Sequence, residues 1–357
     1  MTTRRGFLAT VFAASALPGL TWADAGSPVY LAAAKAADGS FALAGLTAEG
    51  MQSFVLPLPA RGHAACGHPT LPQAVVFARR PGTYALVIDC AAGQIAARLE
   101  APEGHHFYGH GVFSAEGDRL FTTENDIATN QGRIGVWAAQ DGYRRIGDFA
   151  SGGIGPHDIL RLPGRDVLAV ANGGIITALN DDRTKLNIDT MQPNLTYLSL
   201  TGEVRETVTL APEMHKNSIR HLAVRSDGLI GFAMQWEGPP IQTPPLLGLH
   251  AMGGDVVLAA APDDLQPKLA NYIGSIAFDQ AGSTLGLTSP KGSVVALFTA
   301  DGQYTQLLDR PDVCGIGAGR DGFMITDGYG GIAEITNGKI TALTTAAQAW
   351  DNHLIAI

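Results

Sequence analysis

The chain has few charged residues and no run of basic ones. Lysine and arginine number 24 against 33 aspartates and glutamates, which leaves a formal net charge of −9 at pH 7. Nucleic acids and anionic membrane surfaces are bound by clusters of basic side chains, so the composition argues against both as partners. With 46% hydrophobic residues in 357, the chain is too apolar to be disordered and can bury a large core.

Cysteine is scarce, and the motifs that usually contain it are missing. The three cysteines are Cys66, Cys90 and Cys314, and the sequence leaves open whether two of them form a disulfide. No C-x-x-C pair is present, which argues against a compact zinc site, and without C-x-x-C-H covalent haem is excluded. No G-x-S-x-G elbow marks a serine hydrolase. The glycine-rich run 315–319 lacks a strand–turn–helix context, so no nucleotide cofactor is expected.

Beyond residue 25 no stretch of useful length has helical periodicity. The apolar run 7–20 is too short to cross a bilayer, which takes about 20 residues. It follows the arginines at positions 4 and 5 and precedes Ala23-Asp24-Ala25, as in a Tat export signal. An ordinary Sec signal with two arginines is the alternative. We expect cleavage after Ala25 and a periplasmic mature chain without a transmembrane segment.

Histidine and glycine are the residues that mark a repeat in this chain. Five of the ten histidines open short, similar phrases, at His63, His110, His157, His221 and His353. Two further phrases fit the same frame without histidine, at Ser275 and Cys314. Successive anchors lie 39 to 64 residues apart. A repeat of about this length, built from short strands and turns, is typical of a β-propeller.

The repeat that begins at residue 110 shows the pattern most clearly. Turn pairs such as Glu116-Gly117 and Asp141-Gly142 separate strands that we expect at 110–114, 119–124, 134–138 and 143–149. Four antiparallel strands make one propeller blade. Forty-four glycines and twenty prolines supply the tight turns that such a fold requires.

The two ends of the chain are expected to close the ring. Strands predicted at 29–34, 41–46 and 52–58 have no anchor, and the residues from His353 onward suffice for one strand. Joined as a seventh blade, they leave no open sheet edge. We therefore predict an all-β fold, a single seven-bladed β-propeller over residues 26–357. Its four-stranded antiparallel blades start near 63, 110, 157, 221, 275, 314 and 353, and the ring is closed by the C-terminal strand plus the N-terminal strands.

Two inserts interrupt the repeats, at 173–194 and at 236–245, the second with four prolines. Long loops in compact domains are usually lids or binding loops. We expect both to lie beside one mouth of the central channel.

Residues at equivalent anchors should meet in the channel, because the first strand of each blade lines it. Imidazole binds zinc, copper and iron, and thiolate selects softer ions. We therefore predict a transition-metal site (Fe, Cu or Zn), with two to four ligands per ion. The candidate ligands are His63, His110, His157, His221, His353 and Cys314, with Ser275 completing the ring. Neutral imidazole is required, so metal loss is expected below about pH 6. Alternatively, these histidines serve only to satisfy backbone groups or to hold ordered water.

Carboxylates offer a second interpretation. Glu124 and Asp126 end the second strand of their blade, Asp158 follows an anchor, and Asp351 precedes another. Metal-dependent propeller lactonases hold an ion at the channel mouth with such groups, which makes a lactonase-like hydrolase the alternative activity. For Glu124 and Asp126 a polar turn is the simpler explanation. A third hypothesis, a non-catalytic scaffold for another periplasmic protein, rests on the proline-rich insert and the flat propeller faces.

Several phrases resemble those of the DUF1513 family. They are Arg61-Gly62-His63, Thr122-Thr123-Glu124-Asn125-Asp126, Gly155-Pro156-His157, Lys185-Leu186-Asn187, Arg220-His221-Leu222-Ala223 and Trp350-Asp351-Asn352-His353. The resemblance extends over the whole chain. It implies a Tat-exported propeller of the YVTN/quinoprotein-like superfamily, and it assigns no activity and no catalytic residues.

The same resemblance implies an iron-acquisition setting, since such proteins are similar to ones encoded beside imelysin-type and di-haem peroxidase-type iron-uptake proteins. Periplasmic iron-uptake proteins are therefore the expected partners. We expect a monomer that binds a transition metal or an iron-bearing ligand through the channel histidines.

Overall fold

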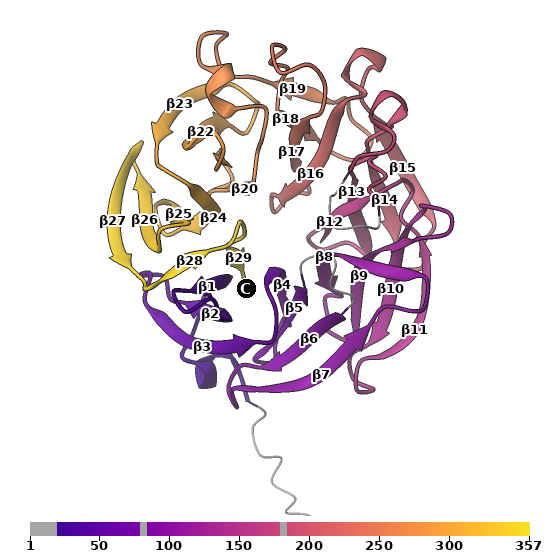
Figure 1. The fold of residues 1–357 in the computed structure, drawn as a ribbon, viewed down its shortest axis with the longest axis vertical. Coiled ribbons are helices and arrows are strands. Elements are labelled where there is room, and N and C mark those ends of the chain that lie inside the picture. The colour runs from indigo at the N-terminus through magenta and orange to yellow at the C-terminus, as the bar shows by residue number, and fades with distance from the viewer. Residues whose placement is uncertain (1–19, 79–83, 179–183) are drawn as a thin grey trace, which may run out of the picture.

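The computed structural model describes residues 20–78, 84–178 and 184–357. Seven sheets stand like blades around a central axis (Figure 1). The all-β, seven-bladed propeller with four-stranded antiparallel blades is thus confirmed. Most of the expected export signal, residues 1–19, lies outside the described residues. Within the described ranges the only helical elements are four short 3-10 turns, η1 (Trp22–Ala25), η2 (Ile188–Thr190), η3 (Pro212–Met214) and η4 (Gln266–Leu269). None of the described helices is long and apolar enough to span a membrane.

Six blades are each built from four consecutive strands, and the first strand of each is innermost (Figure 1). Blade 1 contains β4 (Gly62–Gly67), β5 (Gln73–Ala78), β6 (Tyr84–Asp89) and β7 (Gln94–Glu100); blade 2 contains β8 (His105–Phe113), β9 (Arg119–Asp126), β10 (Gly132–Ala138) and β11 (Arg144–Ala150). Blade 3 contains β12 (Pro156–Arg161), β13 (Val167–Asn172), β14 (Asn194–Ser199) and β15 (Val204–Thr209); blade 4 contains β16 (Asn217–Val224), β17 (Ile230–Trp236), β18 (Leu247–His250) and β19 (Val257–Ala259). Blade 5 contains β20 (Ser275–Phe278), β21 (Thr284–Ser289), β22 (Val294–Thr299) and β23 (Tyr304–Asp309); blade 6 contains β24 (Val313–Gly319), β25 (Gly322–Asp327), β26 (Gly331–Thr336) and β27 (Lys339–Thr345).

The seventh blade joins the two ends of the chain, as predicted. Its strands run β28 (Gln348–Trp350), β1 (Tyr30–Ala36), β2 (Phe41–Leu46) and β3 (Gln52–Leu58), and β29 (Ile355–Ala356) also pairs with β1. The C-terminal contribution is therefore two short strands where one was expected. β28 pairs near Lys35 and β29 near Leu31, so the chain leaves the sheet between them. His353 lies in that break.

The position of a strand in its blade explains its sequence. Middle strands are covered by neighbouring blades on both faces, so β5 is a nearly continuous buried run. The outer strand β7 faces solvent and is mostly exposed. A large apolar cluster joins blades 3, 4 and 5 and contains Tyr197, Phe232 and Phe298, all buried. Packing between blades therefore holds the ring together.

The innermost strand is irregular at the anchor in five blades. The unpaired residue is His157 in β12 and Arg220 in β16. Comparable register shifts surround His63, His110 and Cys314. A bulge leaves a residue outside the ladder and re-aims the neighbouring side chains. The inner strand of blade 5, which has no histidine, pairs without interruption. The bulges thus accompany the histidine anchors of blades 1 to 4 and the cysteine anchor of blade 6.

Candidate metal centre

The five anchor histidines come together in the channel, as their spacing predicted. We call them the histidine girdle: His63, His110, His157, His221 and His353. In eight of its ten histidine pairs the ring centroids lie 4.8 to 6.1 Å apart. All but His157 are buried, with at most 9% of the residue exposed. The girdle is therefore one compact cluster of imidazoles contributed by five blades.

A glycine allows blades 1 and 2 to approach at this point. Gly109 precedes His110 and has a φ of +107°, which side chains rarely tolerate. A Cβ at this position would lie 2.6 Å from Cδ2 of His63. The absence of that atom allows the rings of His63 and His110 to sit 5.0 Å apart.

Two groups of three side chains bring their donor atoms within 4.8 Å of one another. The first contains His63, His110 and His353, and the second contains His110, Asp158 and His221. Ligand atoms around a tetrahedral zinc ion lie about 3.3 Å apart, given zinc–nitrogen bonds of about 2.0–2.1 Å. Small side-chain rotations would close either group around an ion. His110 belongs to both.

His157 is the girdle member that belongs to neither group among the described side chains. Its Nδ1 lies 3.4 Å from Nη1 of Arg220. A guanidinium can only donate, so Nδ1 is the acceptor and its lone pair is engaged.

The bulges explain why His157 is set apart. In the pairing register His157 corresponds to Arg220, and Asp158 corresponds to His221. The sequence alignment of His157 with His221 is therefore wrong by one residue. The structural equivalent of His221 in blade 3 is the carboxylate Asp158.

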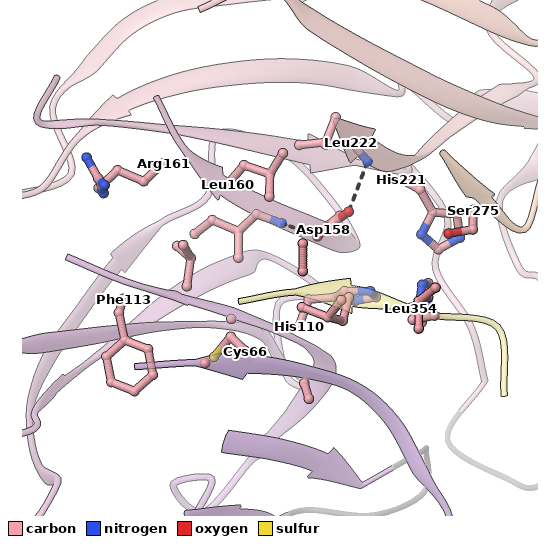
Figure 2. A pocket seen from close by; sticks show the side chains of 18 of the residues that line it. Cys66, His110, Phe113, Asp158, Leu160, Arg161, His221, Leu222, Ser275 and Leu354 are labelled. Carbon is pink, nitrogen blue, oxygen red and sulfur yellow. Dashed lines mark hydrogen bonds between the residues drawn. The ribbon is translucent and has the colours of Figure 1, made fainter. Parts of the chain in front are cut away.

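Asp158 is held by two backbone amides. Its Oδ2 accepts from the amide of Leu222 at 2.9 Å and its Oδ1 from that of Ile159 at 2.8 Å. Figure 2 shows the carboxylate directed at Leu222, with His221 and His110 on the same cavity. Burial raises the pKa of Asp158 to about 6, against the two amides and the charge of His353, which lower it.

Burial also determines the protonation of the girdle. It lowers the pKa of His110 to about 3 and, together with nearby positive charge, holds the pKa of His157 and His221 well below 6.5. These imidazoles are therefore neutral at neutral pH, which is the form that binds metal.

Unpartnered nitrogens point to a ligand. Among the described residues neither ring nitrogen of His110, nor Nδ1 of His221, has a hydrogen-bond partner. The peptide group of His157 acts to raise the pKa of His110, against the larger effect of burial, yet it does not meet hydrogen-bond geometry. Buried polar atoms without partners are rare, and a metal ion would satisfy them. The donor set therefore fits a transition metal.

The girdle lies between two cavities. The loop chamber, of about 230 Å³, is lined by residues that precede the histidines, including Tyr108, Gly155 and Arg220. The strand chamber, of about 320 Å³, is lined by residues that follow them, including Asp158 and Leu222 (Figure 2). Ser275 borders the strand chamber with His221. A ligand could therefore reach the histidines from either side.

The first insert, 173–194, borders the loop chamber, as predicted, whereas no residue of the second insert, 236–245, lines it, and that insert is linked to the chamber through an ion pair with Lys185. Ile175 and Lys185 line the chamber, and the partner of Lys185 in the second insert is Glu237. Glu237 also lies 3.9 Å from Arg220. Residues 179–183 of the first insert lie outside the described residues. Sequence reasoning assigned no role to the two cations, Lys185 and Arg220, although both stand in phrases that carry the family resemblance.

The remaining predicted ligands lie elsewhere. Cys314 is buried in blade 6, and its thiol donates to the carbonyl of Asp312 at 3.2 Å. Burial, with nearby acidic groups, raises the pKa of Cys314 to about 12, so it remains a thiol. The structure does not group it with the histidines among the described side chains. Cys66, Cys90 and Cys314 are all free.

Three of the four predicted carboxylates bond to the scaffold. Fully buried Glu124 accepts from Arg145 and from Thr122, each at 2.7 Å. Asp126 accepts from the hydroxyl of Thr129 at 2.8 Å and so closes its turn. Asp351 accepts from Nε of Arg61 at 2.7 Å. Only Asp158, of the four, joins the histidines in a group of donors.

Fold and site together define a seven-bladed β-propeller with a buried imidazole cluster in its channel. The chain belongs to the family described as "Protein of unknown function (DUF1513)", which matches residues 56–357. The resemblance read from the sequence is thus confirmed. No curated protein matches the chain.

Solved structures share the fold. Kuenenia stuttgartiensis hydrazine synthase is similar with a TM-score of 0.59 at 12% identity, covering 86% of this chain and 90% of that one. A streptogramin B lyase is similar with a TM-score of 0.57 at 17% identity, covering 80% and 84%. At these identities the similarity concerns the fold alone.

Proposed function

We propose that this propeller is a periplasmic metal-binding protein that holds a transition-metal ion, Fe, Cu or Zn, in the histidine girdle. One observation carries the proposal: His63, His110 and His353 place three donor atoms within 4.8 Å in a buried channel. Nitrogen donors of this kind suit the late first-row ions. The unpartnered nitrogens of His110 support the same conclusion.

The loop chamber favours a metal that arrives with an anionic ligand. Its lining includes the cations Lys185 and Arg220, and Glu237 neutralises only part of their charge. A cationic cavity in front of a metal site attracts anions. An iron ion carried by a small carboxylate chelator fits this chamber, and it agrees with the iron-acquisition setting that the family resemblance implies. Delivery to or from periplasmic iron-uptake proteins is the corresponding role.

Metal analysis of protein exported in its native host tests the proposal. Stoichiometric iron, copper or zinc is the expected result, and the H63Q/H110Q double variant should lose it while keeping its circular dichroism spectrum. The variant H215Q, at a half-buried histidine outside the girdle, is the matched control and should retain the metal. Wild-type protein that carries no metal and takes up none of the three ions on titration would contradict the proposal. The scaffold hypothesis would then gain weight.

A metal-dependent hydrolase is the second candidate, and Asp158 is the observation that favours it. A buried carboxyl with a pKa of about 6 beside a metal site is suited to act as a general base near neutral pH. Assays of the loaded protein on a lactone panel test this candidate. Activity that D158N abolishes would support it, and a loaded wild-type protein without turnover would dismiss it for these substrates.

A further inference from the structure

The two groups of donors share one histidine, and we infer that the channel holds two metal ions bridged by the imidazole ring of His110. The first ion would take His63, His110 and His353, and the second His110, Asp158 and His221. This inference rests on the proposed function, that the girdle binds metal at all.

The central position of His110 supports a bridge. Its ring centroid lies 5.0 Å from those of His63 and His353 and 5.9 Å from that of His221. His110 is 5% exposed, and neither of its nitrogens has a hydrogen-bond partner among the described residues. A neutral imidazole has one donor and one acceptor nitrogen. One ion would satisfy only one of them, whereas two ions satisfy both.

The second group is already organised. Asp158 is fixed by the amides of Ile159 and Leu222, and each of its oxygens keeps acceptor capacity for an ion. Nδ1 of His221 is buried without a hydrogen-bond partner among the described residues. The carboxylate also supplies negative charge where two cations would otherwise repel each other. Imidazole with one carboxylate suits divalent copper or zinc.

The bridging step balances without a redox partner. The first ion binds the lone pair of the unprotonated nitrogen of His110. At the other nitrogen the N–H bond breaks, its electron pair forms the bond to the second ion, and the proton passes to the solvent buffer. No oxidation state changes.

Copper(II) titration of the apo mature protein, followed by electron paramagnetic resonance, tests the inference. We expect two equivalents to bind: an ordinary single-copper signal after the first, and a signal lost or split by exchange coupling after the second. D158N should bind one equivalent and keep the single-copper signal, because the first group is intact. H63Q should also bind one, at the second group. H215Q, at a half-buried histidine that belongs to neither group of donors among the described residues, is the control and should bind two coupled ions.

The outcomes separate the two proposals. One equivalent in the wild type, unchanged by D158N, would overturn the inference and leave the proposed function standing. Two equivalents with additive, uncoupled signals would also overturn the bridge. No binding would overturn both. H110Q should abolish the coupling; if it does not fold, comparison of H221Q with H63Q decides, because the bridge predicts one uncoupled ion in each.

Discussion

At the residue scale, burial changes what imidazole can do in this channel. With an ordinary pKa of about 6.5, the sequence alone predicts metal loss below about pH 6. Burial lowers the pKa of His110 to about 3, and the pKa of His221 is also well below 6.5. Protons therefore compete with the metal less effectively, and the structure moves the expected loss to more acidic pH.

The same shifts predict that the apo protein loses stability as the pH falls from 6.5 toward 3. An unfolded histidine takes up a proton near pH 6.5, but folded His110 does so only near 3, so acid favours unfolding in this window. Each such histidine contributes about 1.4 kcal/mol per pH unit. His157 and His221 act in the same direction.

Asp158 opposes this trend between pH 6 and 3.8. Its pKa is raised in the folded state, so the folded protein takes up this proton at a higher pH than the unfolded chain does, and acid favours folding in this window. Urea denaturation at a series of pH values measures the net slope, and H110Q should flatten it by about one proton. A free energy of unfolding that does not change with pH would mean that the histidines are not buried neutral.

Gly109 provides a second residue-scale prediction. G109A adds a Cβ 2.6 Å from His63 at a φ of +107°, so we expect a loss of about 1–3 kcal/mol in stability and weaker metal binding. Gly228 is the matched control, since it has a φ of +94° and a Cβ added there would meet nothing within 4 Å. G228A should cost backbone strain alone and leave metal affinity unchanged. Equal metal affinity in the two variants would exclude a role for Gly109 in the site.

At the element scale, the bulges decide which side chains form the site. The sequence predicted the N-terminal strands at 41–46 and 52–58 to the residue. It placed the start of the second blade at 110, whereas β8 begins at His105, because pairing resumes on the far side of the bulge. A one-residue bulge has no sequence signal of its own, so the equivalence of Asp158 and His221 could not be foreseen.

The ion pair between Glu124 and Arg145 in blade 2 should contribute to stability and not to metal binding. Glu124 is fully buried and bonds to the partly buried Arg145, which also pairs with Asp148, so E124Q replaces a charged hydrogen bond with a neutral one and should cost about 1–3 kcal/mol in unfolding free energy. Metal affinity should not change, since Glu124 belongs to neither group of donors among the described residues. Chemical denaturation and metal titration of the same preparation check both statements. A large loss of metal with stability intact would instead support the lactonase-like arrangement.

The first insert, through Lys185, should tune ligand choice. Lys185 lines the loop chamber and belongs to neither donor group among the described side chains. K185M removes a positive charge that attracts an anionic chelate, so it should weaken binding of ferric citrate about two- to tenfold. Affinity for free copper or zinc should stay the same. E237Q removes the negative charge that pairs with Lys185, so it is the control and should not weaken ferric citrate binding. Isothermal titration calorimetry measures the affinity of each variant for ferric citrate and for the free ions. If K185M weakens the binding of chelate and free ion equally, the proposed role of the loop chamber is contradicted.

At the scale of the whole molecule, the repeat length predicted the most. Anchor spacing indicated the number of blades, the closure of the ring and the convergence of five histidines, because equivalent positions in a propeller must meet at its axis. It did not predict that Cys314 would face Asp312 or that His353 would lie between two short strands. Those details depend on local bulges and on contacts between distant segments, such as Arg61 with Asp351.

The most direct test of the histidine girdle as a metal site is the metal content of wild-type and H110Q protein, expressed in the same host and measured side by side. His110 belongs to both donor groups, so its loss should remove bound metal more completely than any other single substitution. We predict at least one equivalent of iron, copper or zinc in the wild type and a small fraction of that in folded H110Q. Equal metal content in the two proteins would contradict a metal centre built on these histidines.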